Sequence, residues 1–156
     1  MSTTISVVPT VAAQLGELLA VALATAGENY RPVDIYDSFP PSFASWDACI
    51  IGDQVDGAHE YASLKAGRKT RQETYTQQIW FRVIRPGAQS TNARNAAFAQ
   101  LGALEDMIAD APGIGLTEPT LVLNVQGFSC NTTQDAGSMG WLAVLRADVY
   151  VSVRLT

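Results

Sequence analysis

The chain contains one histidine, His59, which lies close in sequence to two carboxylates, Asp56 and Glu60. An imidazole beside a carboxylate can transfer protons in a hydrolytic reaction. The sequence has no nucleophile elbow, phosphate-binding P-loop or zinc-protease motif to accompany this group. We therefore interpret His59 as part of a solvated polar loop and predict that the protein is not an enzyme.

The carboxylates of Asp47, Asp53 and Asp56 could bind a metal ion, but their spacing matches no calcium-binding loop. Cys49 and Cys130 lack the spacing of zinc ligands, and one histidine does not complete a zinc set. We interpret the aspartates as surface charge and the cysteines as reduced and unreactive. We expect no metal and no cofactor.

Charged residues on both sides of His59 form two blocks of opposite sign. The acidic block comprises Asp47, Asp53, Asp56 and Glu60. The basic block comprises Lys65, Arg68, Lys69 and Arg71, and Gly67 with the two residues after it is a reasonable hairpin tip. Two interpretations stay open. The cations either keep a hairpin tip soluble, or they dock onto an acidic surface of another subunit, such as the acidic block of a second copy.

The overall charge argues against a nucleic-acid-binding surface. The 156 residues include 15 acidic and 10 basic side chains, which gives a net charge of -5. Phosphate neutralisation needs clustered cations, so direct DNA contact is the third choice for the basic block. No apolar run reaches the ~20 residues of a membrane span, and the N-terminus lacks a signal-peptide pattern. We expect a soluble protein that is not secreted.

Strand-forming residues continue from position 71 to position 85, where Pro86-Gly87 ends the run. The second half carries apolar groups, among them Ile79, Phe81 and Val83, and belongs in a core. The first half is polar on both faces and has no core to sit in. At ~3.3 Å per residue the strand is roughly 50 Å long, whereas a domain of this size is about 40 Å across. We therefore predict a projecting arm that pairs with a strand of its own chain or of another subunit.

Helical spacing of apolar residues predicts one helix from Pro9 to Gly27 and a second that begins with a cap at Ser90 or Thr91 and ends at Ala111. Further strands are predicted at residues 33–36, 46–51, 120–125 and 141–155, and a mobile loop is predicted at residues 127–140. These elements describe one α+β domain spanning residues 1–156. Two main helices pack on a largely antiparallel twisted sheet, which carries a long projecting β-hairpin.

The order of these features resembles the tail terminator (minor tail) proteins of long-tailed bacteriophages. The resemblance rests on an N-terminal helix, the segment Arg31-Pro32-Val33-Asp34-Ile35-Tyr36-Asp37, Gly52-Asp53 at a strand end, the strand from Glu73 to Arg85 with Gly87, an alanine-rich helix, and Ile114-Gly115 before the closing strands. It covers most of the chain. Its specificity lies in the order of the elements along the chain.

The resemblance implies a structural virion protein. Members of this family form a six-fold ring at the head-proximal end of the tail tube, stop tube polymerisation and present a surface for head–tail joining. The implied partners are further copies of the chain, the tail tube protein and a head–tail connector protein. DNA would pass through the lumen without specific binding, and assembly would take place in the host cytoplasm. The two charge blocks could supply the unlike surfaces that a ring requires.

Two other classes of function stay open. The protein could be another head–tail connector ring, either a stopper or an adaptor. It could also be a small hydrolase or ligand-binding domain, which would require a concave polar pocket around His59.

Overall fold

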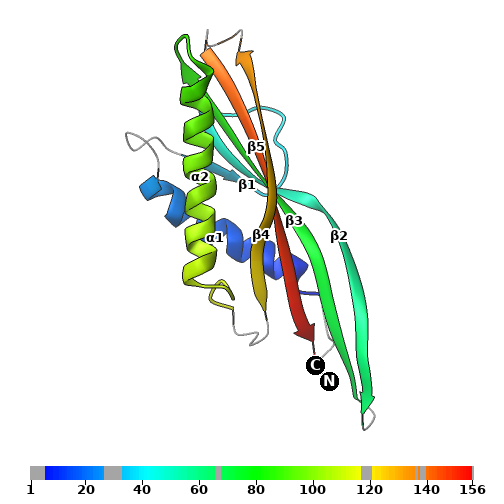
Figure 1. Ribbon diagram of the computed structural model, residues 1–156. Coiled ribbons are helices and arrows are strands. Elements are labelled where there is room, and N and C mark those ends of the chain that lie inside the picture. Colours follow the sequence, from blue (N-terminus) through cyan, green and yellow to red (C-terminus); the bar gives the residue numbers. More distant parts are fainter. Residues whose placement is uncertain are drawn as a thin grey trace.

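The structure is a computed structural model. It describes residues 6–26, 33–65, 68–116, 121–135, 137 and 140–155, and for residues 25, 26, 53, 54, 59–65, 68–71 and 155 it describes the backbone alone. Two helices cover one face of a twisted five-stranded sheet (Figure 1). The predicted α+β class, with two helices on a largely antiparallel sheet, is therefore confirmed.

Helix α1 spans Val8–Ala26 and helix α2 spans Ser90–Asp110, as their apolar periodicity predicts. Buried residues of α1 recur every fourth position, at Val11, Leu15, Leu19 and Leu23, because this spacing keeps them on one face of a helix. The predicted cap of α2 is wrong. Its N-cap is Gln89, which makes no side-chain capping hydrogen bond, and Ser90 already lies within the helix.

The sheet has the strand order β1-β2-β3-β5-β4. Its strands are β1 at Val33–Tyr36, β2 at Asp47–Lys65, β3 at Arg68–Pro86, β4 at Val122–Asp135 and β5 at Gly140–Leu155. Strand β1 runs parallel to β2, and all other neighbours are antiparallel. This order makes β3 the central strand, with β2 on one side and β5 on the other.

The hydrophobic core lies between the helices and one face of the sheet. Every second residue of β5 from Ala143 to Val153 is buried, and Ile79, Phe81 and Val83 of β3 alternate in the same way. This alternation follows from the two-residue period of a strand and agrees with the sequence pattern. Leu104 and Ile108 of α2 complete the same cluster.

Strands β2 and β4 are much longer than predicted. Strand β2 does not end at Gly52 but continues to Lys65, with register shifts between Ile51 and Val55 and between Tyr61 and Ser63. Most of the predicted mobile loop at residues 127–140 is also strand, since β4 pairs with β5 as far as Asp135. Both extensions are polar. Pairing with a neighbouring strand satisfies their backbone groups whatever the side chains are.

The prediction that the first half of β3 has no core to sit in is wrong. Glu73, Tyr75 and Gln77 are buried, and β3 pairs with both β2 and β5 from Arg71 onwards. The buried amide of Gln77 donates hydrogen bonds to the carbonyl oxygens of Gly52 and Gln78, at 2.7 and 3.1 Å. A buried polar side chain with such partners is tolerated in a core. The further projection of the hairpin tip stays a prediction.

The loop between β1 and β2 lies against the face of the sheet opposite the helices. The ring of Phe39 meets that of Trp80 edge to face at 5.5 Å, and the guanidinium of Arg82 lies 4.2 Å from the centre of the Phe43 ring. The second contact has the geometry of a cation–π interaction. Aromatic side chains of this loop thus cover the apolar and cationic part of the open face.

Two glycines should respond oppositely to alanine. A Cβ on Gly140 would lie 2.4 Å from the carbonyl oxygen of Arg85, and backbone atoms cannot yield, so Gly140→Ala should destabilise the protein by about 1–3 kcal/mol. Gly102 lies in α2 with no atom within 4 Å of the same position, so Gly102→Ala should stabilise it by roughly 1 kcal/mol. Urea unfolding of both variants measures these changes. A Gly140→Ala variant as stable as the wild type would contradict the close contact between β5 and β3.

Candidate interaction surface

The two charge blocks lie on the two strands of one hairpin, formed by β2 and β3. In its register Glu60 lies opposite Gln72, Tyr61 opposite Arg71, and Lys65 opposite Arg68. The side chains of Asp53, Glu60, Lys65, Arg68, Lys69 and Arg71, and all of Gly67, lie outside the described part of the chain. The backbone therefore places these residues by position along the strands.

The predicted tip needs one correction. Arg68 and Lys69 belong to β3, not to the turn, since Lys65 and Leu64 of β2 lie opposite them. The partner strand β5 reaches only as far as Arg71, which pairs with Leu155. Among the described residues, Lys69 and Arg68 pair with β2 and not with β5. Three residues of the basic block, Lys65, Arg68 and Lys69, thus lie at the end of the β2–β3 pairing, and the fourth, Arg71, still pairs with β5.

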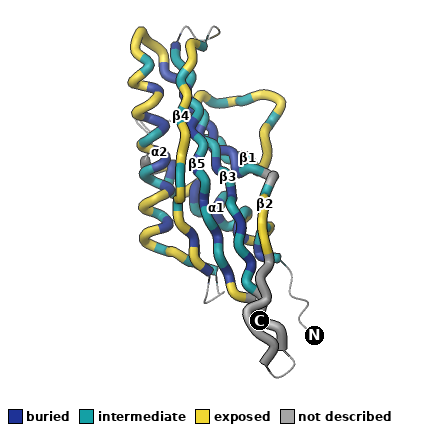
Figure 2. Tube along the Cα trace, turned by 45° about the vertical axis from the view of Figure 1, so that its right-hand side comes forward, coloured by how far each residue is buried: buried dark blue, intermediate teal, exposed yellow. Residues whose placement is uncertain are grey.

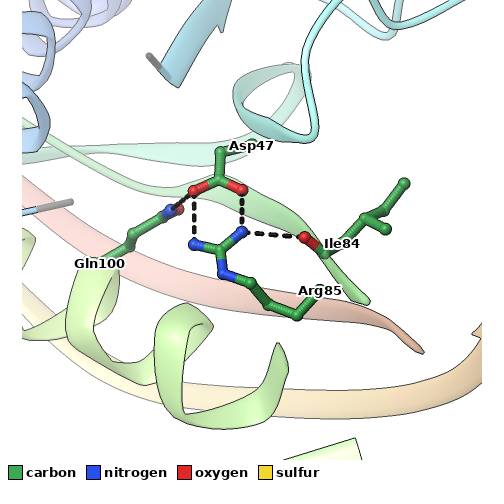
Figure 3. A network of polar contacts seen from close by, with 4 residues as sticks. All are labelled: Asp47, Ile84, Arg85 and Gln100. Carbon is green, nitrogen blue, oxygen red and sulfur yellow. Dashed lines mark hydrogen bonds and ion pairs between the residues drawn. The ribbon is translucent and has the colours of Figure 1, made fainter. Parts of the chain in front are cut away.

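Asp47 was predicted to be a surface charge, and this prediction is wrong. Its side chain is buried against Arg85 of β3, which donates from both terminal nitrogens to the two carboxylate oxygens (Figure 3). The amide of Gln100 in α2 donates to Oδ2 of Asp47 at 3.2 Å. A two-point contact of this kind is the strongest geometry for an ion pair.

The buried ion pair has a structural role. Asp47 begins β2, Arg85 ends β3 and Gln100 lies in α2, so the three side chains join two strands and a helix. Arg85 also donates to the carbonyl oxygen of Ile84 at 2.9 Å. The sequence carried no local signal for this contact, because Arg85 is one of several cations along its strand. Its partner was visible only once β2 and β3 were paired.

Glu73 forms a second link between distant segments. Its Oε1 accepts hydrogen bonds from the hydroxyl of Ser6 at 2.9 Å and from the backbone amide of Val7 at 3.0 Å. A carboxylate is favourable beside the unpaired amides at a helix N-terminus. Burial, together with the nearby negative charge of Glu73, raises the pKa of Tyr75 above its ordinary value. The start of α1 is thereby fixed to β3, two residues from the basic block.

The candidate catalytic and metal-binding residues do not come together among the described residues. His59 lies in β2 opposite Glu73, and so its backbone belongs to a strand and not to a loop; its side chain lies outside the described residues. Asp56 is exposed. Cys49 and Cys130 are free, and burial raises the pKa of both thiols. Within the described residues no three His, Cys, Asp or Glu side chains lie close enough to hold a metal ion.

The two helices form an apolar groove with a volume of about 610 Å³. Leu18, Val21 and Met107 line it, with Asp106 at one side. Val21 is 70% exposed, which is unusual for a large apolar side chain on a structured helix. Neither described helix is long and apolar enough to cross a membrane.

Removing one partner of the buried ion pair should be costly. Asp47→Ala leaves the guanidinium of Arg85 buried without its counter-charge, and we expect the free energy of unfolding to fall by about 3–5 kcal/mol. Urea denaturation measures the change. Asp56→Ala is the matched control, because Asp56 is an exposed aspartate of the same strand and its loss should change stability by less than about 0.5 kcal/mol. Equal stabilities of the two variants would show that the buried pair is not formed.

No protein-family model matches the sequence, and no curated protein matches it. Three features of the chain bear on its function. They are the cationic end of the β2–β3 pairing, the burial of Asp47 and the strand order of the sheet.

Proposed function

We propose that this protein is a structural virion subunit that forms a ring at the head-proximal end of the tail tube of a long-tailed bacteriophage. There it stops tube polymerisation and provides the surface for head–tail joining. By the resemblance described above, the ring has six copies and assembles in the host cytoplasm. Its partners are further copies of itself, the tube protein and a connector protein, and DNA crosses the lumen without specific binding.

The observation that carries the proposal is the register at the end of the hairpin. Lys65 lies opposite Arg68, and Lys69 is the next residue of β3. Like charges on directly opposed residues destabilise a pair of strands. An acidic surface would attract these cations and offset their repulsion. The end of this hairpin is therefore better suited to a contact with another subunit than to full exposure to solvent.

Exposed carboxylates elsewhere on the chain provide such a partner. Asp47 is excluded because it is buried, but Asp56 is exposed. Helix α2 presents Glu105, Asp106 and Asp110 to solvent, and α1 presents Glu17. A basic hairpin end and an acidic surface on the same chain are unlike surfaces. Contacts between unlike surfaces are head-to-tail, and they close into a ring when the rotation between copies permits it.

Changing the charge of the hairpin end should weaken assembly in a graded way. We expect Arg68→Gln with Lys69→Gln to reduce ring formation, and Arg68→Glu with Lys69→Glu to reduce it further, because attraction becomes repulsion. Both should unfold at the wild-type urea concentration, since these side chains belong to the end of a ribbon. Analytical ultracentrifugation at two salt concentrations measures the assembly, and the wild-type complex should weaken as salt rises.

A control with the same charge change separates this contact from a general effect of charge. Ala20→Glu with Ala24→Glu adds two negative charges at exposed positions of α1, which equals the change made by the two glutamine substitutions. This control should assemble at least as tightly as the wild type, because its added charges lie beside Glu17 on an acidic surface. Normal assembly of the glutamate double variant at Arg68 and Lys69 would remove the hairpin end from the interface.

The role at the tube end is tested separately, by electron microscopy of tails assembled without this protein. A terminator halts tube growth, so its loss should produce tubes longer than those of intact virions. Tails of normal length that fail to join heads would instead identify the protein as a stopper or adaptor of the connector. Normal tails joined to heads would contradict both roles.

A further inference from the structure

Strand β4 forms one edge of the sheet, and no strand of the described residues pairs with the outer side of residues 127–134. The strand pairs with β5 from Val122 to Asp135. Figure 2 shows β4 as a largely exposed strand beside the more buried β5. From α2, the ring of Phe98 meets that of Phe128 edge to face at 5.5 Å, and Arg94 lies near enough to Cys130 to affect its pKa. Phe128 is still 57% exposed.

The pairing shows which backbone groups of β4 point outward. The amide of Leu123 donates to the carbonyl oxygen of Pro112, so the backbone N–H of Leu123 points away from β5. Backbone direction alternates along an antiparallel strand, and the register shifts by one residue between Val125 and Gly127. After this bulge the residues whose backbone points outward are Phe128, Cys130, Thr132 and Gln134. The residues between them are bonded to β5.

The two halves of β4 differ in whether other described residues bond to their outer side. In the first half the segment after α2 covers the strand through the bond between Leu123 and Pro112, at 3.2 Å. In the second half no described residue outside the sheet forms a backbone hydrogen bond with residues 127–134. Exposed edges are normally protected by lysine, proline or inward-pointing charge. Residues 127–135 contain no lysine, arginine or proline, and Asp135 is their one charged residue.

The opposite edge of the sheet has a strand direction that fits this one. That edge is formed by β1 and by the part of β2 that continues past it. Strand β1 is parallel to β2, and the three antiparallel steps from β2 through β3 and β5 to β4 make β2 and β4 run in opposite directions. Copies related by rotation about an axis along the strands keep these directions. The β1–β2 edge of one copy would therefore meet β4 of the next as an antiparallel neighbour.

We infer that residues 127–134 of β4 are a strand-addition site for the β1–β2 edge of a second copy, so that the sheet continues from one subunit to the next. This inference rests on the proposed ring and names the backbone contact that would close it. Pairing of these two edges removes both from solvent and satisfies the outward amides of β4. The contact is head-to-tail, as a closed ring requires.

Proline substitutions at adjacent residues test the site. Thr132→Pro removes an amide that points outward, and proline is tolerated on an edge strand when its nitrogen faces away from the sheet. We expect its unfolding midpoint in urea to stay near that of the wild type, while the dissociation constant for assembly rises at least tenfold. Thr133→Pro is the matched control. It removes an amide bonded to β5 and should lower the unfolding midpoint. Gln134→Pro repeats the test at a second outward amide, should Thr132→Pro fail to fold.

Hydrogen exchange followed by mass spectrometry identifies the partner. On assembly of the wild type, peptides that contain residues 127–135 and residues 33–36 should both gain protection. If the Thr132→Pro and Gln134→Pro variants both fold and both assemble like the wild type, the edge contact is overturned. The proposed ring is not affected by that outcome. Protection of the β4 peptide alone, in a complex of two copies, would mean that β4 pairs with itself and would also overturn the inference. A wild type that stays monomeric even on tail tubes would contradict the proposed function itself.

Discussion

The fold depends on β3, which is paired along most of its length by β2 on one side and by β5 on the other. A central strand gains backbone hydrogen bonds from both neighbours, and these bonds do not depend on its side chains. This explains how a strand whose first half is polar can lie in the middle of a sheet. The apolar half supplies the packing against the helices, and the polar half supplies partners such as Glu73 for the start of α1.

The buried contact of Asp47 with Arg85 gives this arrangement its second constraint. Two charges removed from water are costly unless each finds a close partner, and here both carboxylate oxygens are used. Gln100 extends the contact from the sheet to α2. One carboxylate thus joins the start of β2, the end of β3 and the second helix. The same contact removes Asp47 from the set of charges that another molecule could reach.

The remaining surfaces favour association with other copies over chemistry on a small substrate. The end of the β2–β3 hairpin places cations opposite one another, and the exposed face of α2 is acidic. The second half of β4 is an edge without the usual protection. A charge contact can select and orient a neighbour, whereas backbone pairing between strands can hold it. The proposed ring combines both kinds of contact, and each lies at a different part of the chain.

The sequence by itself determined the two helices, the apolar strands and the α+β class, because periods of 3.6 and two residues are local properties of the chain. It also placed the basic block at a hairpin tip, whereas the register of β2 and β3 puts the acidic block on the same pair of strands. Tertiary structure alone decided that the polar residues after Gly52 and after Val125 form strands. Pairing with a neighbouring strand stabilises these segments, and their own side chains do not. Tertiary structure alone buried Asp47 and Glu73 as well. Their partners, Arg85 and the start of α1, are far away in sequence and become neighbours only when the strands pair and the helix packs.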